Sequence, residues 1–108
     1  MNKGSVVEIA QFTLAAGVNN GDFLQEAEAV QKNFLEKQPG YVDRELLKGG
    51  DGQWADILHW NSMEEARKAS EALLKDPIAQ EFMRKIDPAS VRMLHLMQMR
   101  KWKERGSG

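Results

Sequence analysis

The sequence predicts a single α+β domain with a ferredoxin-like β-α-β-β-α-(α)-β antiparallel sheet. Segments of alternating hydrophobicity and segments of helical periodicity follow one another in that order. The stretch Trp54–Ala66, WADILHWNSMEEA, is typical of a strand that runs directly into a helix, because Ser62 and Glu65 have the spacing of a capping box. The run Gly49–Gly52, GGDG, separates two alternating segments and predicts a hairpin turn.

The first half of the chain is predicted to form a strand, a helix and a second strand. Ser5–Leu14 alternates as a strand does, and the Gly- and Asn-rich stretch after it indicates a loop. Asp22 is expected to cap a helix that stops near Gln38, because the following Pro-Gly pair disfavours helical geometry. The second strand is expected at Tyr41–Lys48. The apolar residues at helical spacing are Phe23, Ala27, Val30 and Phe34.

The second half is predicted to form a strand, two helices and a last strand. Gln53–Trp60 is the third strand, and the helix from Met63 to about Lys75 follows it. Asp76-Pro77 is expected to open a third, short helix, since a cap precedes a proline at the first helical position. Asp87-Pro88 ends that helix, and Ser90 to about Lys101 is the last strand. The residues expected on the apolar helix faces are Met63, Ala66, Ala69, Leu73, Ile78, Phe82 and Ile86.

Composition and charge narrow the class of protein. The chain has 108 residues, 42% hydrophobic and 29% charged, which is typical of one globular domain. We expect residues 1–105 to form it and Gly106-Ser107-Gly108 to be a linker or cloning remnant. The net charge of -1 argues against nucleic-acid and anionic-membrane partners, and the basic run 100–105 is interpreted as a solvated tail. The absence of cysteine and of long apolar runs leads us to expect a soluble, cytoplasmic protein.

The predicted sheet has no purely polar face. The last strand places Met93, His95 and Met97 on one side, and Leu94 and Leu96 on the other. Helices can cover one face, so the other face needs a partner, and a second copy of the same sheet is the simplest one. We therefore expect a homodimer formed through the sheet face.

Three short motifs resemble one known group of proteins. The turn 38–41 (QPGY), the strand end 59–62 (HWNS) and the helix start 64–66 (EEA) resemble the dimeric α+β barrel superfamily, especially antibiotic-biosynthesis-monooxygenase-like domains. The resemblance covers roughly Val6–Trp102 and implies two sheets paired across a homodimer. Members of this superfamily oxidise phenols or quinols without metal or flavin, degrade haem, isomerise metabolites, or have no known chemistry. The haem-degrading branch has a histidine on the helix after the third strand, and residues 63–83 contain none.

Two side chains are candidates for proton transfer. Glu8 is predicted on the same strand face as Phe12, where a carboxylate is costly to bury without a partner. Desolvation would raise its pKa and make it a plausible proton acceptor, or it pairs with Arg92 or Arg100 in a structural ion pair. His59 is either a general base near neutral pH or a polar residue that touches water near the strand end.

The large apolar residues of the predicted strands could surround a ligand. Trp54 and Trp60 would wall a flat aromatic molecule, or they pack under the second helix or at the dimer seam. The resemblance favours Trp60 and indicates Tyr41, because the family uses a tryptophan and a tyrosine in its pocket. Phe12 is a further candidate for the lining. His95, set among methionines, is either a substrate-binding residue that serves as a haem or soft-metal ligand, or a hydrogen-bonded residue of an adaptable apolar seam.

Two functions follow from these residues. The first is a cofactor-independent, monooxygenase-like enzyme for a small aromatic or quinone-like molecule, in which Glu8 or His59 accepts a proton while Trp60 and Tyr41 hold the ring. The second is a non-catalytic dimeric barrel that binds a small ligand or has a structural or stress-related role. A pocket filled by Trp60, Phe12 and the second helix would favour the second function. The chain lacks metal-ligand spacings and a phosphate-binding loop, so we expect no metal and no cofactor.

Overall fold

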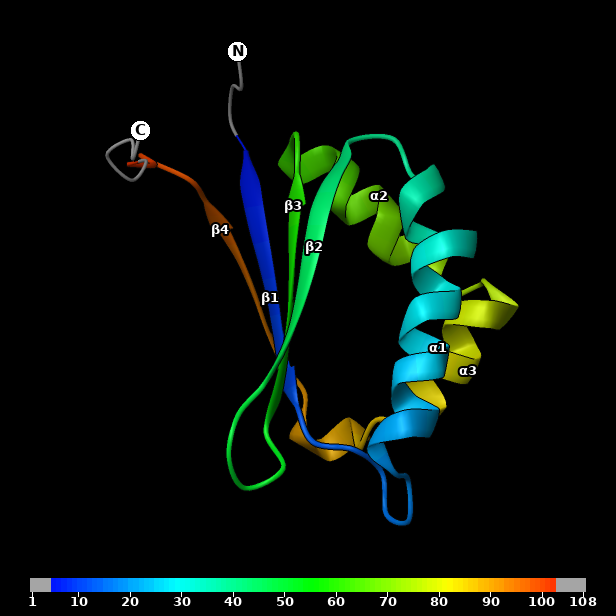
Figure 1. Cartoon of the computed structure of the whole chain (residues 1–108). Helices are drawn as coiled ribbons and strands as arrows, with labels where there is room; N and C mark the ends of the chain where they lie inside the picture. The colour runs from blue at the N-terminus through cyan, green and yellow to red at the C-terminus, as the bar shows by residue number, and fades with distance from the viewer. Residues whose placement is uncertain (1–4, 103–108) are drawn as a thin grey trace, which may run out of the picture.

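The computed structural model describes residues 5–102 and places three helices on one face of a four-stranded antiparallel sheet (Figure 1). This arrangement confirms the predicted ferredoxin-like α+β fold. The strand order across the sheet is β2-β3-β1-β4. The elements are β1 (Val6–Phe12), α1 (Asn20–Asn33), η1 (Leu35–Lys37), β2 (Tyr41–Lys48), β3 (Trp54–Trp60), α2 (Met63–Leu73), α3 (Pro77–Arg84), η2 (Pro88–Ser90) and β4 (Arg92–Met97).

Helix caps explain where most of the helices begin. The Ser62 hydroxyl accepts a hydrogen bond from the backbone N–H of Glu65, and the Asp76 carboxylate accepts one from Ala79, as predicted. The predicted cap of the first helix is wrong. Asn19 caps α1, since it has the extended backbone that a cap requires and its side-chain oxygen accepts from the N–H of Asp22 at 2.8 Å.

The first and last strands are shorter than the alternating pattern predicts. β1 ends at Phe12 because the N–H of Thr13 turns to the Ser90 hydroxyl at 2.9 Å, and Leu14 then forms only an isolated bridge with Ile86. The chain before β4 forms η2 instead of strand. On α2, Met63 is 42% exposed, so its predicted burial is also wrong. It lies in the first turn of that helix, where the chain has only just left the sheet.

The turn between β2 and β3 has the predicted form. Asp51 and Gly52 have positive φ angles of 52° and 75°, which the GGDG sequence tolerates. The N–H of Gly49 donates to the carbonyl of Gln53 at 2.8 Å and closes the hairpin. This turn sets the register of β2 and β3 as far as the pair Asp43–His59, and an irregularity between Asp43 and Tyr41 then shifts the pairing.

The sheet has two different faces, which we call the helix side and the outer side. On β3, Trp54, Asp56, Leu58 and Trp60 are buried on the helix side, while the residues between them point to the outer side. The register carries this division to the neighbouring strands. Apolar residues of the outer side are Val7, Ile9, Leu47, Ala55, Ile57, Leu94 and Leu96. Leu94 and Leu96 are about half exposed, at 51% and 48%.

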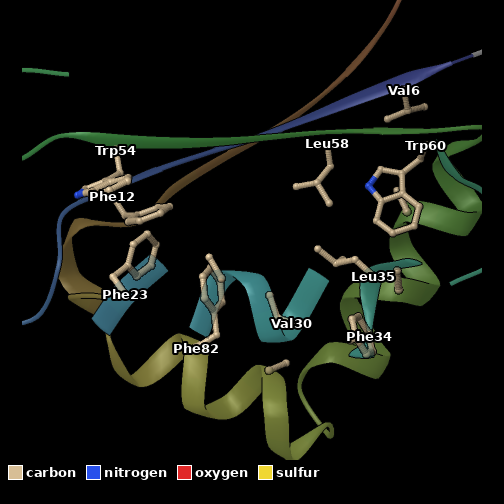
Figure 2. Close-up of a cluster of buried hydrophobic side chains, with 14 residues drawn as sticks. Val6, Phe12, Phe23, Val30, Phe34, Leu35, Trp54, Leu58, Trp60 and Phe82 are labelled. Carbon is tan, nitrogen blue, oxygen red and sulfur yellow. The ribbon is translucent and has the colours of Figure 1, made fainter. Parts of the chain in front are cut away.

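The core fills the layer between the helix side of the sheet and the helices. One end is aromatic, where Phe23 of α1 lies 4.9 Å from Trp54 and 5.4 Å from Phe82 between ring centroids (Figure 2). Trp54 therefore packs against α1, and not under α2 or at a dimer seam. Trp60 lies at the other end, near Leu35. Both tryptophans are almost fully buried.

The structure describes neither end of the chain, and the helices that it describes are not of the membrane-spanning kind. The expected terminal remnant at 106–108 lies outside the described residues, as does the part of the basic run after Trp102. Within residues 5–102, the helices are too short and too polar to cross a membrane.

Candidate active site between the sheet and the helices

A cavity of about 370 Å³ separates the middle of the sheet from the helices. This volume falls in the range of sites that bind small organic molecules. Its wall is mostly apolar, with Phe12, Leu58 and Trp60 from the sheet and Val30, Leu73 and Phe82 from the helices. Phe12 and Trp60 therefore line an open space and do not fill it. Three charged side chains also reach the wall, namely Glu8, Arg44 and Asp56.

Glu8 is held in the wall of this cavity by its neighbours on the sheet. β1 places it on the helix side between Leu58 of β3 and His95 of β4, and its side chain is 12% exposed. The indole N–H of Trp60 donates a hydrogen bond to Glu8 Oε1 at 3.0 Å. His95 Nε2 lies 3.4 Å from the same oxygen. Glu8 thus has an aromatic donor and an imidazole on one oxygen.

The surroundings of Glu8 make it bind a proton more tightly than a carboxylate in water does. Burial raises the pKa of the Glu8 carboxyl above its ordinary value of 4.5, and the nearby Asp56 carboxylate adds to the increase. His95 and the Trp60 hydrogen bond lower the pKa of Glu8 but do not outweigh burial. A carboxylate in such a place binds a proton more readily than one in water, which is the property a general base needs.

The partner of Glu8 is not one of the arginines that the sequence suggested. Arg92 lies opposite Gln11 in the register of β1 and β4, so it belongs to the outer side. Arg100 follows β4 and is exposed. The ion-pair alternative with Arg92 or Arg100 is therefore wrong, because strand alternation separates Glu8 from Arg92.

A second group of charges, Arg44 and Asp56, was not singled out from the sequence. Arg44 Nε and Nη2 donate to the two carboxylate oxygens of Asp56, both at 2.8 Å, and the side chains are 7% and 8% exposed. Arg44 Nη1 also donates to the carbonyl of Ala27 at 3.0 Å and to Gln31 at 3.3 Å. This bidentate pair satisfies both charges internally, so it offers no free cation to a ligand.

The pair could have been found from two signals in the sequence. Asp56 falls in the buried alternation between Trp54 and Leu58, where a carboxylate needs a partner. The hairpin turn pairs Leu46 with Asp56 and Arg44 with Leu58, which puts Arg44 diagonally across from Asp56 on the same face.

The structure places the remaining candidates in different environments. His59 lies on the outer side, where its Nδ1 is 2.6 Å from Asp43 Oδ1, so it is separated by the sheet from Glu8 and from the cavity. The Tyr41 ring packs edge-on against Trp60 with centroids 6.0 Å apart, and the Tyr41 hydroxyl accepts a hydrogen bond from Gln31 at 2.8 Å. Tyr41 thus supports Trp60 from behind and does not line the cavity.

His95 contacts Glu8 but is not part of the cavity wall. Its Nε2 is buried and has no hydrogen-bond partner among the described residues. The remainder of its side chain is 30% exposed at β4, which is an edge strand. In the described part of the chain, no group of three or more His, Asp or Glu side chains is placed to hold a metal ion.

Comparison with known proteins gives structural relatives. No protein-family model and no curated protein matches the chain. SnoaB, a cofactor-independent oxygenase from Streptomyces nogalater, is 20% identical, with 94% of this chain and 97% of that chain covered and a TM-score of 0.64. A dimeric ferredoxin-like protein from an uncultured marine organism is 7% identical, with 96% of each chain covered and a TM-score of 0.65. A mutant of MhuD with two manganese protoporphyrin IX bound per active site is 19% identical, with 92% and 99% covered and a TM-score of 0.64.

These likenesses extend over nearly the whole length of each chain. At identities of 7–20%, they show that the chain shares the ferredoxin-like fold of these proteins. A shared fold does not by itself transfer an activity, so the function has to be argued from the cavity.

Proposed function

We propose that this protein is a cofactor-independent, monooxygenase-like enzyme that acts on a small aromatic or quinone-like molecule. The observation that carries the proposal is Glu8, a carboxyl with a raised pKa in the wall of a largely apolar cavity of about 370 Å³. Such a site accepts a flat apolar molecule and sets a proton acceptor beside it. The similar fold of SnoaB, a cofactor-independent oxygenase, supports the same reaction class.

Glu8 is the proposed proton acceptor, and Trp60 and Phe12 are proposed to hold the ring. His59 is not carried into this role, because it lies on the outer side of the sheet. Tyr41 would act indirectly by keeping Trp60 in place. Loss of a proton makes the substrate electron-rich, so that it can react with O2. Insertion of one oxygen atom in place of two substrate hydrogens, with the other oxygen released as water, needs no external reductant.

We also infer that two copies pair through the outer side of the sheet. Its central residues are apolar, and Leu94 and Leu96 are about half exposed in the single chain. One protein of the same fold is itself dimeric. A standard interface removes roughly 800 Å² from each partner, which at about 25 cal/mol per Å² of apolar surface is a large gross driving force. A second copy of the sheet has the matching shape and chemistry.

Light scattering tests the dimer directly. We expect the mass of two chains at micromolar concentration, and the mass of one chain for Leu94→Lys, because a buried unpaired ammonium opposes association. The exposed position of Leu94 in the single chain should let the variant fold, which circular dichroism would check. A wild-type protein that stays monomeric under these conditions contradicts the inference.

Oxygen consumption with a panel of hydroquinones, catechols and fused-ring phenols tests the activity. We expect uptake by the wild type and a decrease of roughly 100-fold or more for Glu8→Gln, which keeps the shape but cannot accept the proton. Glu28→Gln is the matched control, because Glu28 lies on the exposed surface of α1 and should leave the rate unchanged.

The same panel distinguishes the enzyme from the second candidate function, a non-catalytic barrel that binds a small ligand. Apart from Glu8 and the closed Arg44–Asp56 pair, the cavity wall is almost wholly uncharged, which also suits a binding protein without chemistry. Saturable ligand binding without oxygen uptake, or uptake equal in wild type and Glu8→Gln, would reject the enzyme and favour that alternative.

A further inference from the structure

The contact between Glu8 and His95 joins two strands that are far apart in the sequence. The register of β1 and β4 sets the two residues directly opposite each other on the helix side. Glu8 Oε1 and His95 Nε2 are 3.4 Å apart, and the Nε2 atom is buried without a hydrogen-bond partner among the described residues. The 3.4 Å separation is close to hydrogen-bond length, and catalytic hydrogen bonds can tighten when a ligand binds.

His95 also reaches solvent, which Glu8 scarcely does. The His95 side chain is 30% exposed and that of Glu8 is 12% exposed. β4 is an edge strand, and Figure 1 shows it as the strand farthest from the helices. Met93 and Met97, the neighbours of His95 on the same face, are 45% and 60% exposed. His95 therefore lies between the cavity residue Glu8 and the open edge of the sheet.

Among the described residues that line the cavity, no other ionisable group is free to exchange a proton with Glu8. Asp56 of β3 and Arg44 of β2 face the same space, but they are paired with each other at 2.8 Å. The helices contribute uncharged side chains, such as Val30, Ser70 and Met83. His95 is thus the titratable neighbour to which Glu8 can pass a proton.

We propose that His95 is a positioning residue that acts through Glu8. It accepts the proton that Glu8 has received and exchanges this proton with solvent at the edge of β4. The proposal rests on the proposed function, since it requires Glu8 to receive a proton from a ligand. The substrate proton moves to a Glu8 oxygen and then to His95 Nε2, so Glu8 returns to its carboxylate form. A proton returns by the same route when the second oxygen atom of O2 leaves as water, and the proton balance over one turnover closes.

A titration of Glu8 tests the pairing without any turnover. The carboxyl carbon of Glu8 in protein labelled with 13C-glutamate can be assigned by its loss in Glu8→Gln and followed by NMR against pH. The contact with His95 lowers the pKa of Glu8, so His95→Gln should move the Glu8 midpoint to higher pH. His59→Gln is the matched control and should leave the Glu8 midpoint unchanged. An unchanged midpoint in His95→Gln would overturn the proposal.

Turnover tests the relay itself. With a substrate that the wild type oxidises, His95→Ala should slow oxygen uptake by about 100-fold, and added imidazole should restore it by occupying the vacated space. Loss that imidazole does not restore would indicate a structural role and overturn the relay. Loss in Glu8→Gln without loss in His95→Ala would overturn the relay alone, whereas absence of uptake by the wild type would overturn the proposed function and the relay with it.

Discussion

Each side of the sheet carries one carboxyl–histidine pair, Glu8 with His95 on the helix side and Asp43 with His59 on the outer side. The two pairs use the same chemical groups and are both built across neighbouring strands. Their surroundings differ, because the Glu8 side chain is 12% exposed and the Asp43 side chain is 64% exposed. The side of the sheet on which a carboxyl lies therefore determines how much water it contacts, even though both carboxyls have a histidine as partner.

The physical reason is desolvation. On the helix side, water is replaced by aromatic and aliphatic groups, so the charged form of Glu8 loses hydration that His95 and Trp60 restore only in part. On the outer side of the single chain, Asp43 keeps most of its contact with water, and a pair exposed in this way contributes about 0–1 kcal/mol to stability. The Arg44–Asp56 pair lies on the helix side as well and is buried together with Glu8.

The largest expected effect is on the buried ion pair of the helix side. Asp56→Ala would leave the Arg44 guanidinium buried without its carboxylate, and we expect a loss of about 3–5 kcal/mol in the free energy of unfolding. Urea denaturation measures it. Asp43→Ala is the matched control on the outer side. A loss below about 1 kcal/mol for Asp56→Ala would show that water reaches Arg44 and that the two sides differ less than their burial indicates.

A smaller effect is expected in the pH dependence of stability. Because the folded state raises the pKa of Glu8, it binds this proton more tightly than the unfolded chain does. The resulting contribution to stability is complete below the ordinary value of 4.5 and is lost as the pH rises through the folded pKa. Wild type should therefore lose stability relative to Glu8→Gln as the pH rises from 4.5 toward neutrality.

Unfolding in urea at a series of pH values checks this sign, with Glu28→Gln as a carboxylate control outside the cavity. The wild-type and Glu8→Gln curves should separate as the pH increases and then run parallel. A separation that develops in the opposite direction would mean that hydrogen bonds to the Glu8 carboxylate outweigh its burial.

The smallest effect belongs to the exposed pair. In the single chain, as in the monomeric Leu94→Lys variant expected above, Asp43→Asn should change the free energy of unfolding by less than about 0.5 kcal/mol, because the Asp43 side chain is 64% exposed. The midpoint of thermal or urea unfolding measures it. A change above about 1 kcal/mol would show that the pair on the outer side is not equivalent to an ordinary surface contact, and the contrast between the sides would weaken.

Much of the secondary structure could be predicted from local patterns in the sequence. The capping box at Ser62, the GGDG turn and the alternation through Trp54–Trp60 are interactions within a few residues, so the sequence displays them directly. The cap at Asn19 was misplaced because two capping residues lie close together and only the backbone geometry selects between them. The face of Glu8 could be predicted, since alternation alone assigns it to the side of Phe12.

The partners of these residues depended on contacts between distant segments. Alternation cannot indicate that Glu8 meets His95 and Trp60, because those contacts need the register of β1 with both β4 and β3. Alternation also predicts apolar residues on both faces of the sheet, and it does not indicate which face the helices cover. That choice placed Glu8 in the cavity wall and His59 on the outer side.

The amino-acid sequence by itself determined the order of the elements, the hairpin and the alternation of faces along β1 and β3, because short-range backbone preferences and hydrophobic periodicity decide these features. The tertiary structure alone decided which face became the helix side, which histidine met Glu8 and how much water each pair retained. Those features arise when strands distant in the chain pair and helices pack on one face, and this packing leaves two similar carboxyls with different exposure to water.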